Sequence, residues 1–212
     1  MLSIENNILP TREVRSSSPL LASMWRERKS VFVDVLGWDV PIVDDAFEID
    51  QFDTEHAVYM VIADEARTKH LASVRLLPST RPHILGDIFP QLCAGSVPRA
   101  PGTWEITRLC MSPALSGVRQ AMLVRRELAL GLAEYALDNG ISDYTQVHLA
   151  AHLPQLLAVG WDCDPLGFPV DIAGQRLMAS RIAITSATLT RIRAATGVRQ
   201  PVLQTPPLAM AA

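Results

Sequence analysis

The sequence predicts an α/β protein in which one central sheet has helices on both of its faces. Apolar runs of strand length alternate with segments whose apolar residues recur every three or four positions. The 212 residues are enough for one domain with a sizeable core, whereas two domains would each be small. The hydrophobic content of 49% is typical of globular proteins and argues against disorder.

The first part of the chain is expected to hold an edge strand over residues 1–8, then a helix and a long irregular segment. Residues 20–36 repeat apolar side chains at helical spacing, and Gly37 is placed to end this helix. Residues 38–54 have no clean period, which in a compact domain is typical of a lid or a binding loop. We therefore expect an amino-terminal lid at about residues 20–54.

The middle of the chain is expected to form a hairpin and a third strand. Apolar runs predict strands over residues 57–63 and 70–77, a short helix over 84–89, and a strand over 103–110. Arg75 lies inside the second of these strands, where a buried charge needs a partner. It ties down a loop through a salt bridge, contacts a ligand directly, or does both.

The last part of the chain begins with the longest predicted helix. We expect a helix over 118–139, a strand over 143–149, a helix over 152–159, a strand over 174–184 and a helix over 186–195. Residues 1–196 are expected to form a single domain. The Pro-rich residues 197–212 are expected to be a flexible tail.

Candidate site residues gather in the irregular segment and in one later strand. Three carboxylates stand between aromatic and apolar residues in the order Phe47, Glu48, Ile49, Asp50, Phe52, Asp53. Strand alternation over 104–108 places Glu105 and Thr107 on one face, with Trp104, Ile106 and Arg108 on the other. Carboxylates beside aromatic rings suit a ligand that is cationic and partly apolar. The alternative is a polar surface loop followed by an ordinary strand.

Ten charged and aromatic residues occur in one order along the chain: Arg28, Phe32, Trp38, Glu48, Asp50, Asp53, Arg75, Phe89, Glu105 and Arg108. Arg75 is the first residue of the run Arg-Leu-Leu-Pro-Ser-Thr-Arg-Pro-His at 75–83. This ordered set resembles the acyl-homoserine-lactone synthases of bacterial quorum sensing. The resemblance is strongest over about residues 24–108 and continues more weakly to about residue 168.

The resemblance implies an acetyltransferase-like three-layer αβα sandwich with a central mixed sheet. It also implies a reaction between S-adenosyl-methionine and an acyl thioester carried by acyl carrier protein or coenzyme A. In that reaction the amine is acylated and the carboxylate closes a lactone, which releases methylthioadenosine. Both compounds are substrates, so no cofactor is expected.

Each step of that reaction suggests roles for residues in the ordered set. The protonated amine needs a base, for which Glu105 is the first candidate and Asp50 and Asp53 the next. The sulfonium suits carboxylates and aromatic faces. Arg28 and Arg108 either hold the substrate carboxylate or fix the acid cluster. The catalytic candidates are Glu105, Asp50, Asp53 and Arg28, and those for binding S-adenosyl-methionine are Phe32, Trp38, Glu48, Arg75, Trp104 and Arg108.

The acyl chain is expected to lie behind the sheet. Its candidate lining consists of Leu85, Phe89, Gln146, Val147, His148 and Leu149. Family members that accept 3-oxo chains often carry a threonine on the strand equivalent to residues 143–149. Our alignment places Gln146 and His148 on that face and turns Thr145 to the opposite one, which puts a 3-oxo preference in doubt. A histidine such as His148 either bonds a polar acyl group or is satisfied by its neighbours.

The sequence favours a carrier protein over coenzyme A as the acyl donor, and both remain open. Residues 112–119 lack the Gly-rich turn with which acetyltransferases hold the coenzyme A pyrophosphate. The acidic surface of a carrier protein would instead dock on Arg119, Arg125 and Arg126. The alternative for these three arginines is an ordinary solvated helix face.

Other partners and chemistries are not indicated by the sequence. A formal charge of −3 argues against general nucleic-acid binding, and no apolar run is long enough for a membrane span. Cys93, Cys110 and Cys163 are expected to be reduced thiols of a cytoplasmic protein. The scattered histidines predict no metal site. Two alternative functions remain: a coenzyme A-dependent N-acyltransferase for another amine, and a non-catalytic ligand sensor of the same fold.

Overall fold

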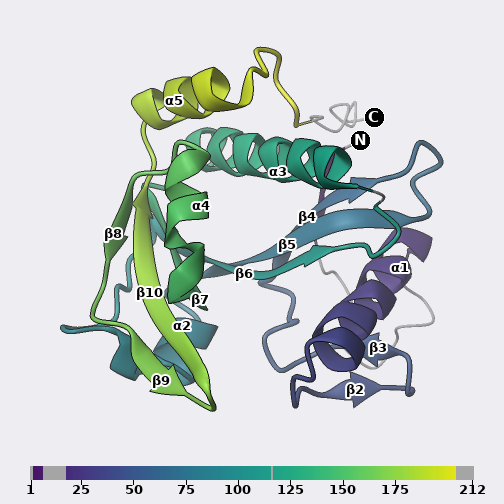
Figure 1. Ribbon diagram of the computed structural model, residues 1–212, viewed down its shortest axis with the longest axis horizontal. Helices are drawn as coiled ribbons and strands as arrows, with labels where there is room; N and C mark the ends of the chain where they lie inside the picture. The colour runs from purple at the N-terminus through teal and green to yellow at the C-terminus, as the bar shows by residue number, and fades with distance from the viewer. Residues whose placement is uncertain (1, 7–17, 116, 204–212) are drawn as a thin grey trace, which may run out of the picture.

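The computed structural model describes residues 2–6, 18–115 and 117–203, which form a three-layer α/β fold (Figure 1). Within these residues, eight strands form one mixed sheet in the order β1-β4-β5-β6-β7-β10-β8, and β9 pairs with β10. The sheet strands are β1 (Leu2–Asn6), β4 (Val58–Ala63), β5 (His70–Pro78), β6 (Thr103–Met111), β7 (Asp143–Leu149), β8 (Cys163–Pro165), β9 (Val170–Ile172) and β10 (Gln175–Ala183). The predicted α/β class with a central mixed sheet is confirmed.

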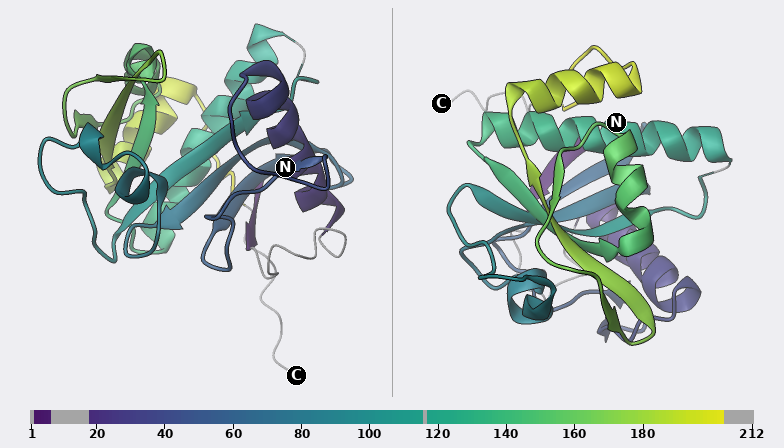
Figure 2. Two further views of the ribbon diagram at one scale, coloured as in Figure 1. Left: turned by 90° about the horizontal axis from the view of Figure 1, so that it is seen from below. Right: turned by 60° about the vertical axis from the view of Figure 1, so that its left-hand side comes forward.

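Helices cover both faces of this sheet. On one face lie α1 and α2, and on the other lies the long α3, with α5 packed outside it (Figure 2). The helices are α1 (Pro19–Arg28), the π-helix η2 (Lys29–Val35), α2 (Ile84–Asp87), η3 (Pro90–Leu92), α3 (Val118–Asp138), η4 (Ala150–His152), α4 (Leu153–Ala158) and α5 (Ser186–Thr196). Among the described residues, no helix combines the length and apolar content that crossing a bilayer requires.

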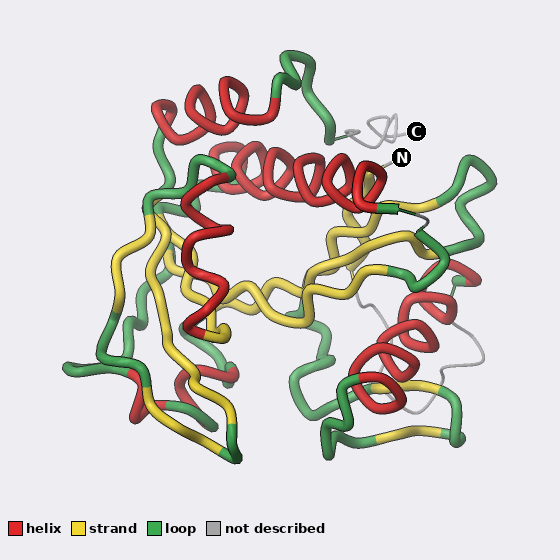
Figure 3. The backbone as a smooth tube through the Cα atoms, in the orientation of Figure 1, coloured by secondary structure: helices red, strands yellow, loops and turns green. Residues whose placement is uncertain are grey.

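The sheet changes character between β6 and β7. The pairs β1–β4, β4–β5 and β5–β6 are antiparallel, whereas β6 and β7 run parallel. The parallel pairing joins only Thr103–Ile106 to residues 143–146. Beyond it the two strands diverge, so the β1-to-β6 half and the β7-to-β10 half of the sheet splay apart (Figure 3).

Two apolar layers hold the helices against the sheet. The larger cluster lies between the sheet and α3, where the predicted stripe residues Val124, Leu128 and Leu132 are buried. Gly131 lets this helix approach closely, because an added Cβ would lie 2.3 Å from Leu2 and 3.0 Å from the Met60 sulfur. A second cluster, which includes Met24 and its neighbours on α1, covers the opposite face of β4 and β5.

Each predicted helix and strand is present within a few residues of its expected bounds. Two differences affect the site. The predicted helix over residues 20–36 changes from α1 to a π-helix at Lys29, and the irregular segment contains a small hairpin of β2 (Ile42–Val43) and β3 (Phe47–Glu48). The short strands β8 and β9 were not predicted, since three-residue strands have too few positions to show a period.

The end of the described chain lies against α3 and β1. Glu134 of α3 accepts the backbone N–H groups of Val202 and Leu203 at 2.9 and 3.2 Å. Leu203 also forms a parallel bridge with Leu2. The remainder of the segment expected to be a flexible tail, residues 204–212, lies outside the described residues.

Candidate active site

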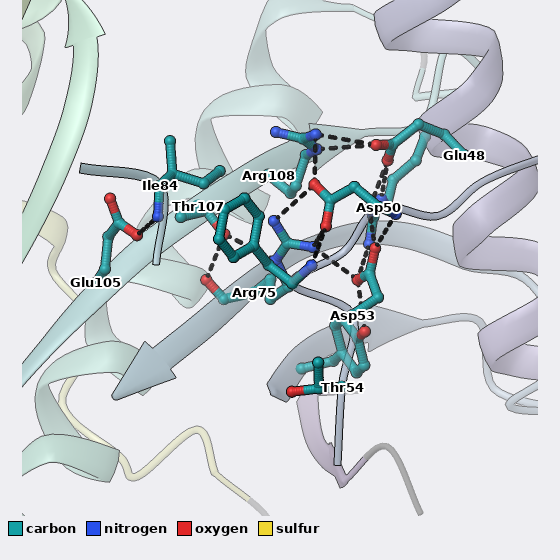
Figure 4. Close-up of polar contacts among 12 residues, drawn as sticks. Glu48, Asp50, Asp53, Thr54, Arg75, Ile84, Glu105, Thr107 and Arg108 are labelled. Carbon is teal, nitrogen blue, oxygen red and sulfur yellow. Dashed lines mark hydrogen bonds and ion pairs between the residues drawn. The ribbon is translucent and has the colours of Figure 1, made fainter. Parts of the chain in front are cut away.

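Three carboxylates and three arginines meet on the α1 side of the sheet and form what we call the ion cluster: Glu48, Asp50, Asp53, Arg28, Arg75 and Arg108 (Figure 4). The carboxylates come from β3 and the turn after it, whereas the arginines come from α1, β5 and β6. The turn is shaped by its own acids. Asp53 accepts the backbone N–H of Asp50, and Asp50 accepts that of Phe52, each at 2.8 Å.

Arg28, the last residue of α1, binds two of the carboxylates of the cluster. Its Nη1 and Nη2 donate to the two oxygens of Asp53 at 2.9 and 2.8 Å, and its guanidinium also pairs with Glu48. The hydroxyl of Tyr59 donates to the same Asp53 carboxylate at 2.6 Å. Asp53 and Glu48 have no exposed side-chain surface, so the acids that were predicted as lid residues are part of the protein interior.

Arg75 holds the same acids from the sheet. It donates to both oxygens of Asp50 at 2.6 and 3.1 Å and lies 2.8 Å from Asp53. Its Nε donates to the hydroxyl of Thr107 at 3.0 Å. The Nε, Nη1 and Nη2 atoms of Arg75 thus each donate to an acceptor of the protein itself. Of the two roles considered for Arg75, this geometry supports the first, in which Arg75 ties down a loop through salt bridges.

Arg108 joins the cluster through a β-bulge. Its backbone has φ = 52°, and the β5–β6 register shifts between Ser73 and Arg75. Regular alternation would turn Arg108 toward α3, away from Glu105 and Thr107. The bulge instead turns it to Glu48, at 3.0 Å from Nη2, and to Asp50 at 2.7 Å. The face predicted for Arg108 from alternation is therefore wrong. Arg108 nevertheless contacts two of the predicted acids.

The buried pairing of Asp53 with two arginines favours the ionised form of each partner. Burial would raise the pKa of Asp53, but the charges of Arg28 and Arg75 lower it well below its ordinary value. Burial would lower the pKa of Arg28, yet the charges of Asp53 and Glu48 raise it further above its already high value. By formal charge, the cluster balances three arginines against three carboxylates.

An aromatic pair borders the ion cluster. The rings of Phe32 and Trp38 stack with centroids 4.8 Å apart and planes within 6°. The backbone fixes this stack, because the Trp38 N–H donates to the Phe32 carbonyl at 2.8 Å where the π-helix ends. The guanidinium carbon of Arg108 lies 5.6 Å from the Phe32 centroid and 5.9 Å from that of Trp38. Arg108 therefore connects these two predicted residues to the predicted acids Glu48 and Asp50.

Glu105 lies apart from the ion cluster and has a different kind of partner. Its two oxygens accept the backbone N–H groups of Ile84 and Leu85, at the start of α2, at 2.8 and 2.7 Å (Figure 4). Its side chain is fully buried. Burial raises the pKa of Glu105 to about 7, and the two backbone hydrogen bonds hold it from rising further. It is therefore a carboxyl group that exchanges its proton near neutral pH.

The predicted acyl lining divides between the two faces of the sheet. Leu85, Phe89 and Val147 pack together, and Leu149 pairs with Leu177 at the edge of that group. Gln146 and His148 lie on the other face. Gln146 is paired with Ser180 of β10, and the hydroxyl of Ser180 lies 3.0 Å from His148 Nε2. The prediction that Gln146 and His148 share a lining with Leu85 and Phe89 is thus contradicted, because alternation along β7 separates them.

Thr145 lies on the face of β7 toward α2, which the sequence analysis had assigned to Gln146 and His148. Tyr144 faces α3, where its hydroxyl donates to the Leu132 carbonyl at 3.0 Å, so Thr145 faces α2. It lies beside Glu105 in the parallel pairing, and its buried hydroxyl has no hydrogen-bond partner among the described residues.

Two further predicted groups are not part of the ion cluster. Trp104 packs against the α3-side core, on the face opposite Glu105, so its predicted contact with S-adenosyl-methionine has no geometric support. At the start of α3, Arg119 and Arg125 are exposed, and Arg125 Nε lies 3.3 Å from the Met111 sulfur. Arg126 instead points to α5 and donates to the Thr196 carbonyl at 3.5 Å.

Two contributors to the site were not selected from the sequence. Tyr59 lies within an uninterrupted apolar run, where a tyrosine reads as core, yet its hydroxyl is bonded to Asp53. Thr107 was placed on the face of Glu105 but was given no role, although it accepts from Arg75. For Thr107 the signal was present, because a polar residue on a buried strand face needs a partner.

The class of fold is shared with a protein of known structure. The fold is similar to that of an acyl-CoA N-acyltransferase from Pseudomonas aeruginosa, with a TM-score of 0.51, 16% identity, and coverage of 86% of this chain and 99% of that one. This likeness shows the fold alone. It supports the α/β class of fold with one central mixed sheet.

Closer comparisons give the family. The family model described as autoinducer synthase matches residues 12–192, so the chain belongs to this family. An acyl-homoserine-lactone synthase of Ralstonia nicotianae is 32% identical over 190 residues, which cover 86% of this chain and 92% of that protein. A solved structure of a CoA-dependent acyl-homoserine lactone synthase, MesI, has a TM-score of 0.80 at 27% identity and covers 96% of this chain and 98% of its own.

Proposed function

We propose that this enzyme makes an acyl-homoserine lactone from S-adenosyl-methionine and an acyl thioester, releasing methylthioadenosine. The observation that carries the proposal is the meeting of the ion cluster with the Phe32–Trp38 stack, in a chain of the autoinducer synthase family. A sulfonium is a permanent cation without a proton to donate, so carboxylates and ring faces are its natural partners. The predicted acids and rings lie side by side here.

Acylation begins when the amine of S-adenosyl-methionine attacks the thioester carbonyl. An α-amino group has a pKa of roughly 7.7–8.0, so it must lose a proton first. Glu105 is our candidate for the acceptor because its pKa of about 7 suits proton exchange near neutral pH. Asp53 is the weaker candidate, since the two arginines that contact it favour its ionised form and make it a poor base.

Lactone closure requires the substrate carboxylate to approach the carbon beside the sulfonium from the side opposite the leaving sulfur. No proton moves in this step, so positioning supplies most of the catalysis. The ion cluster is suited to positioning because its six charged groups fix one another through short contacts. We assign Asp50 to this task, since it joins Arg75 to Arg108 beside the rings.

We propose an acyl carrier protein as the donor. Around the exposed Arg119 and Arg125, the start of α3 also exposes the apolar side chains of Val118, Met122 and Leu123, at 78, 47 and 52%. An acidic partner with a small apolar surface matches this combination. Coenzyme A is the competing donor, and the relative MesI is named as CoA-dependent.

The test of the reaction is direct. Purified protein is incubated with S-adenosyl-methionine and a panel of acyl-carrier-protein and acyl-coenzyme A donors of different length, and lactone and methylthioadenosine are measured by mass spectrometry. We expect both products in equal amounts. Asp50→Asn should lose them, while Asp39→Asn, an exposed aspartate in the same segment, should retain them. Folded protein that forms neither product with any donor would contradict the proposal.

The donor is tested by reversing charge at the start of α3. Arg119→Glu combined with Arg125→Glu should raise the KM for carrier-protein donors at least tenfold and leave kcat nearly unchanged. Arg176→Glu, an exposed arginine of β10, is the matched control. An equal effect of both variants, or activity with coenzyme A donors only, would exclude the carrier protein as the physiological donor.

A further inference from the structure

The position suited to the substrate cation already holds a cation of the protein. Arg108 lies within 6 Å of both rings of the Phe32–Trp38 stack and donates to Glu48 and Asp50. Among the described arginines it is the one with cation–π contacts to two rings, whereas Arg75 and Arg26 each contact one. The partners that we propose for the sulfonium are thus the present partners of Arg108.

Two uncommon backbone features bring about this contact. The π-helix at Lys29–Val35 closes with the hydrogen bond from Trp38 to Phe32, which sets the two rings side by side. On β6, the positive φ of Arg108 and the register shift turn its side chain toward those rings. A regular helix and a regular strand would make neither arrangement. Unusual backbone of both kinds is concentrated at functional sites.

Charge balance limits how a second cation can enter. The three guanidinium groups of the ion cluster neutralise its three carboxylates, so an added sulfonium would meet no net attraction. One of the arginines must then give way. Arg28 and Arg75 are 1 and 0% exposed, whereas the side chain of Arg108 is 10% exposed and is therefore the one with access to water.

We propose that Arg108 acts as an internal placeholder for the substrate cation and is displaced by the sulfonium when S-adenosyl-methionine binds. The inference rests on the proposed function and deepens it by naming the residue that sets the charge selectivity of the site. The exchange conserves the charge of the site, since one cation leaves as another enters. The resting enzyme therefore keeps its acids paired, and binding of the cationic substrate should depend little on salt.

The experiment compares two ligands that differ in charge. S-adenosyl-methionine and S-adenosyl-homocysteine share the adenosine, the amine and the carboxylate, and the second is the neutral thioether without the sulfonium methyl. Their affinities are measured by calorimetry for the full-length wild type, Arg108→Gln and Arg108→Lys. Arg191→Gln serves as the control, because it also removes one positive charge. Arg191 lies on α5, in the opposite layer, and forms an exposed ion pair with Asp162.

We expect Arg108→Gln to raise the preference for S-adenosyl-methionine over the neutral thioether at least tenfold, and to make that preference fall with salt. Arg108→Lys keeps the charge and should stay within threefold of the wild type, as should Arg191→Gln. If Arg108 holds the carboxylate that both ligands share, Arg108→Gln will weaken both equally, and the inference is overturned. If the folded wild type binds neither ligand, the proposed function fails as well.

Discussion

Two buried carboxylates on the same side of the sheet, Asp53 and Glu105, show how the type of partner decides what an acid can do. Asp53 is neutralised by the guanidinium groups of Arg28 and Arg75, and its pKa is held far below the ordinary value. Glu105 is equally buried, but its partners are two backbone N–H groups, and its pKa is raised to about 7. Burial acts in the same direction on both, so the full charges of the arginines make the difference.

The difference in pKa gives the two acids different uses: Asp53 provides a fixed negative charge, and Glu105 can accept and release a proton. An acid that stays ionised at every working pH can position a cation but is a poor proton acceptor. An acid with a pKa near neutrality can accept a proton and later return it. The ion cluster therefore suits the sulfonium and the closing carboxylate, and Glu105 suits the amine. Each of the following predictions tests one side of this division.

The largest expected effect is on stability, at Asp53. Asp53→Asn should lower the free energy of unfolding by about 3–5 kcal/mol, because it leaves Arg28 and Arg75 with one buried anion fewer. Urea unfolding monitored by fluorescence measures this change. Asp34→Asn is the control, since its pair with Lys29 is 48 and 27% exposed and should contribute less than about 1 kcal/mol. Equal losses would mean that the ion cluster is no more important than a surface pair.

The next effect is on rate, at Glu105. Glu105→Gln should slow lactone formation in a single turnover by about 10²–10⁴-fold, because an amide accepts no proton. Its affinity for S-adenosyl-methionine should change little, since the ion cluster is left complete. Glu55→Gln, an exposed substitution of the same type, should keep the full rate. A rate within tenfold of wild type would remove Glu105 from proton transfer and leave it only the anchoring of α2.

The pH dependence of stability should differ in sign between the two groups. The folded-state pKa of Glu105 lies above its ordinary value, so its contribution is complete below about pH 4.5 and is lost as pH rises through 7. Asp53 has a lowered pKa, so its contribution is present above about pH 4 and is lost on acidification. Between pH 5 and 8 the wild type should lose roughly 2–3 kcal/mol relative to Glu105→Gln. Parallel urea-unfolding profiles for the two proteins would contradict the raised pKa.

The sequence predicted the acids and rings of the site better than their arrangement. The order and spacing of charged residues identified Asp50, Asp53 and Arg75, which the structure brings into contact. Alternation failed at Arg108 because a β-bulge inserts one residue, and a single sequence carries no mark of the shift. It also could not give the backbone partners of Glu105, since these depend on where α2 begins relative to β6.

The fold was predictable to the extent that its elements are periodic. The long helix α3 and the buried strand β4 carry strong patterns and occur near their predicted bounds. The parallel junction of β6 with β7 brings together residues about 40 positions apart in the chain, and no local pattern encodes it. The same junction decides which face of β7 lies toward α2, which is why Gln146 and His148 were assigned to the wrong side.

The smallest effect tests how the ion cluster is supported from the sheet. Thr107→Val should lower the free energy of unfolding by about 1–3 kcal/mol, because the Nε of Arg75 loses its acceptor while both remain buried. Thr107→Ser keeps the hydroxyl and should recover most of that loss, which separates the hydrogen bond from the shape of the side chain. In Thr107→Val the Arg75 pair with Asp50 persists, so the affinity for S-adenosyl-methionine should fall less than tenfold. A larger loss of affinity without a loss of stability would assign Thr107 to the substrate rather than to Arg75.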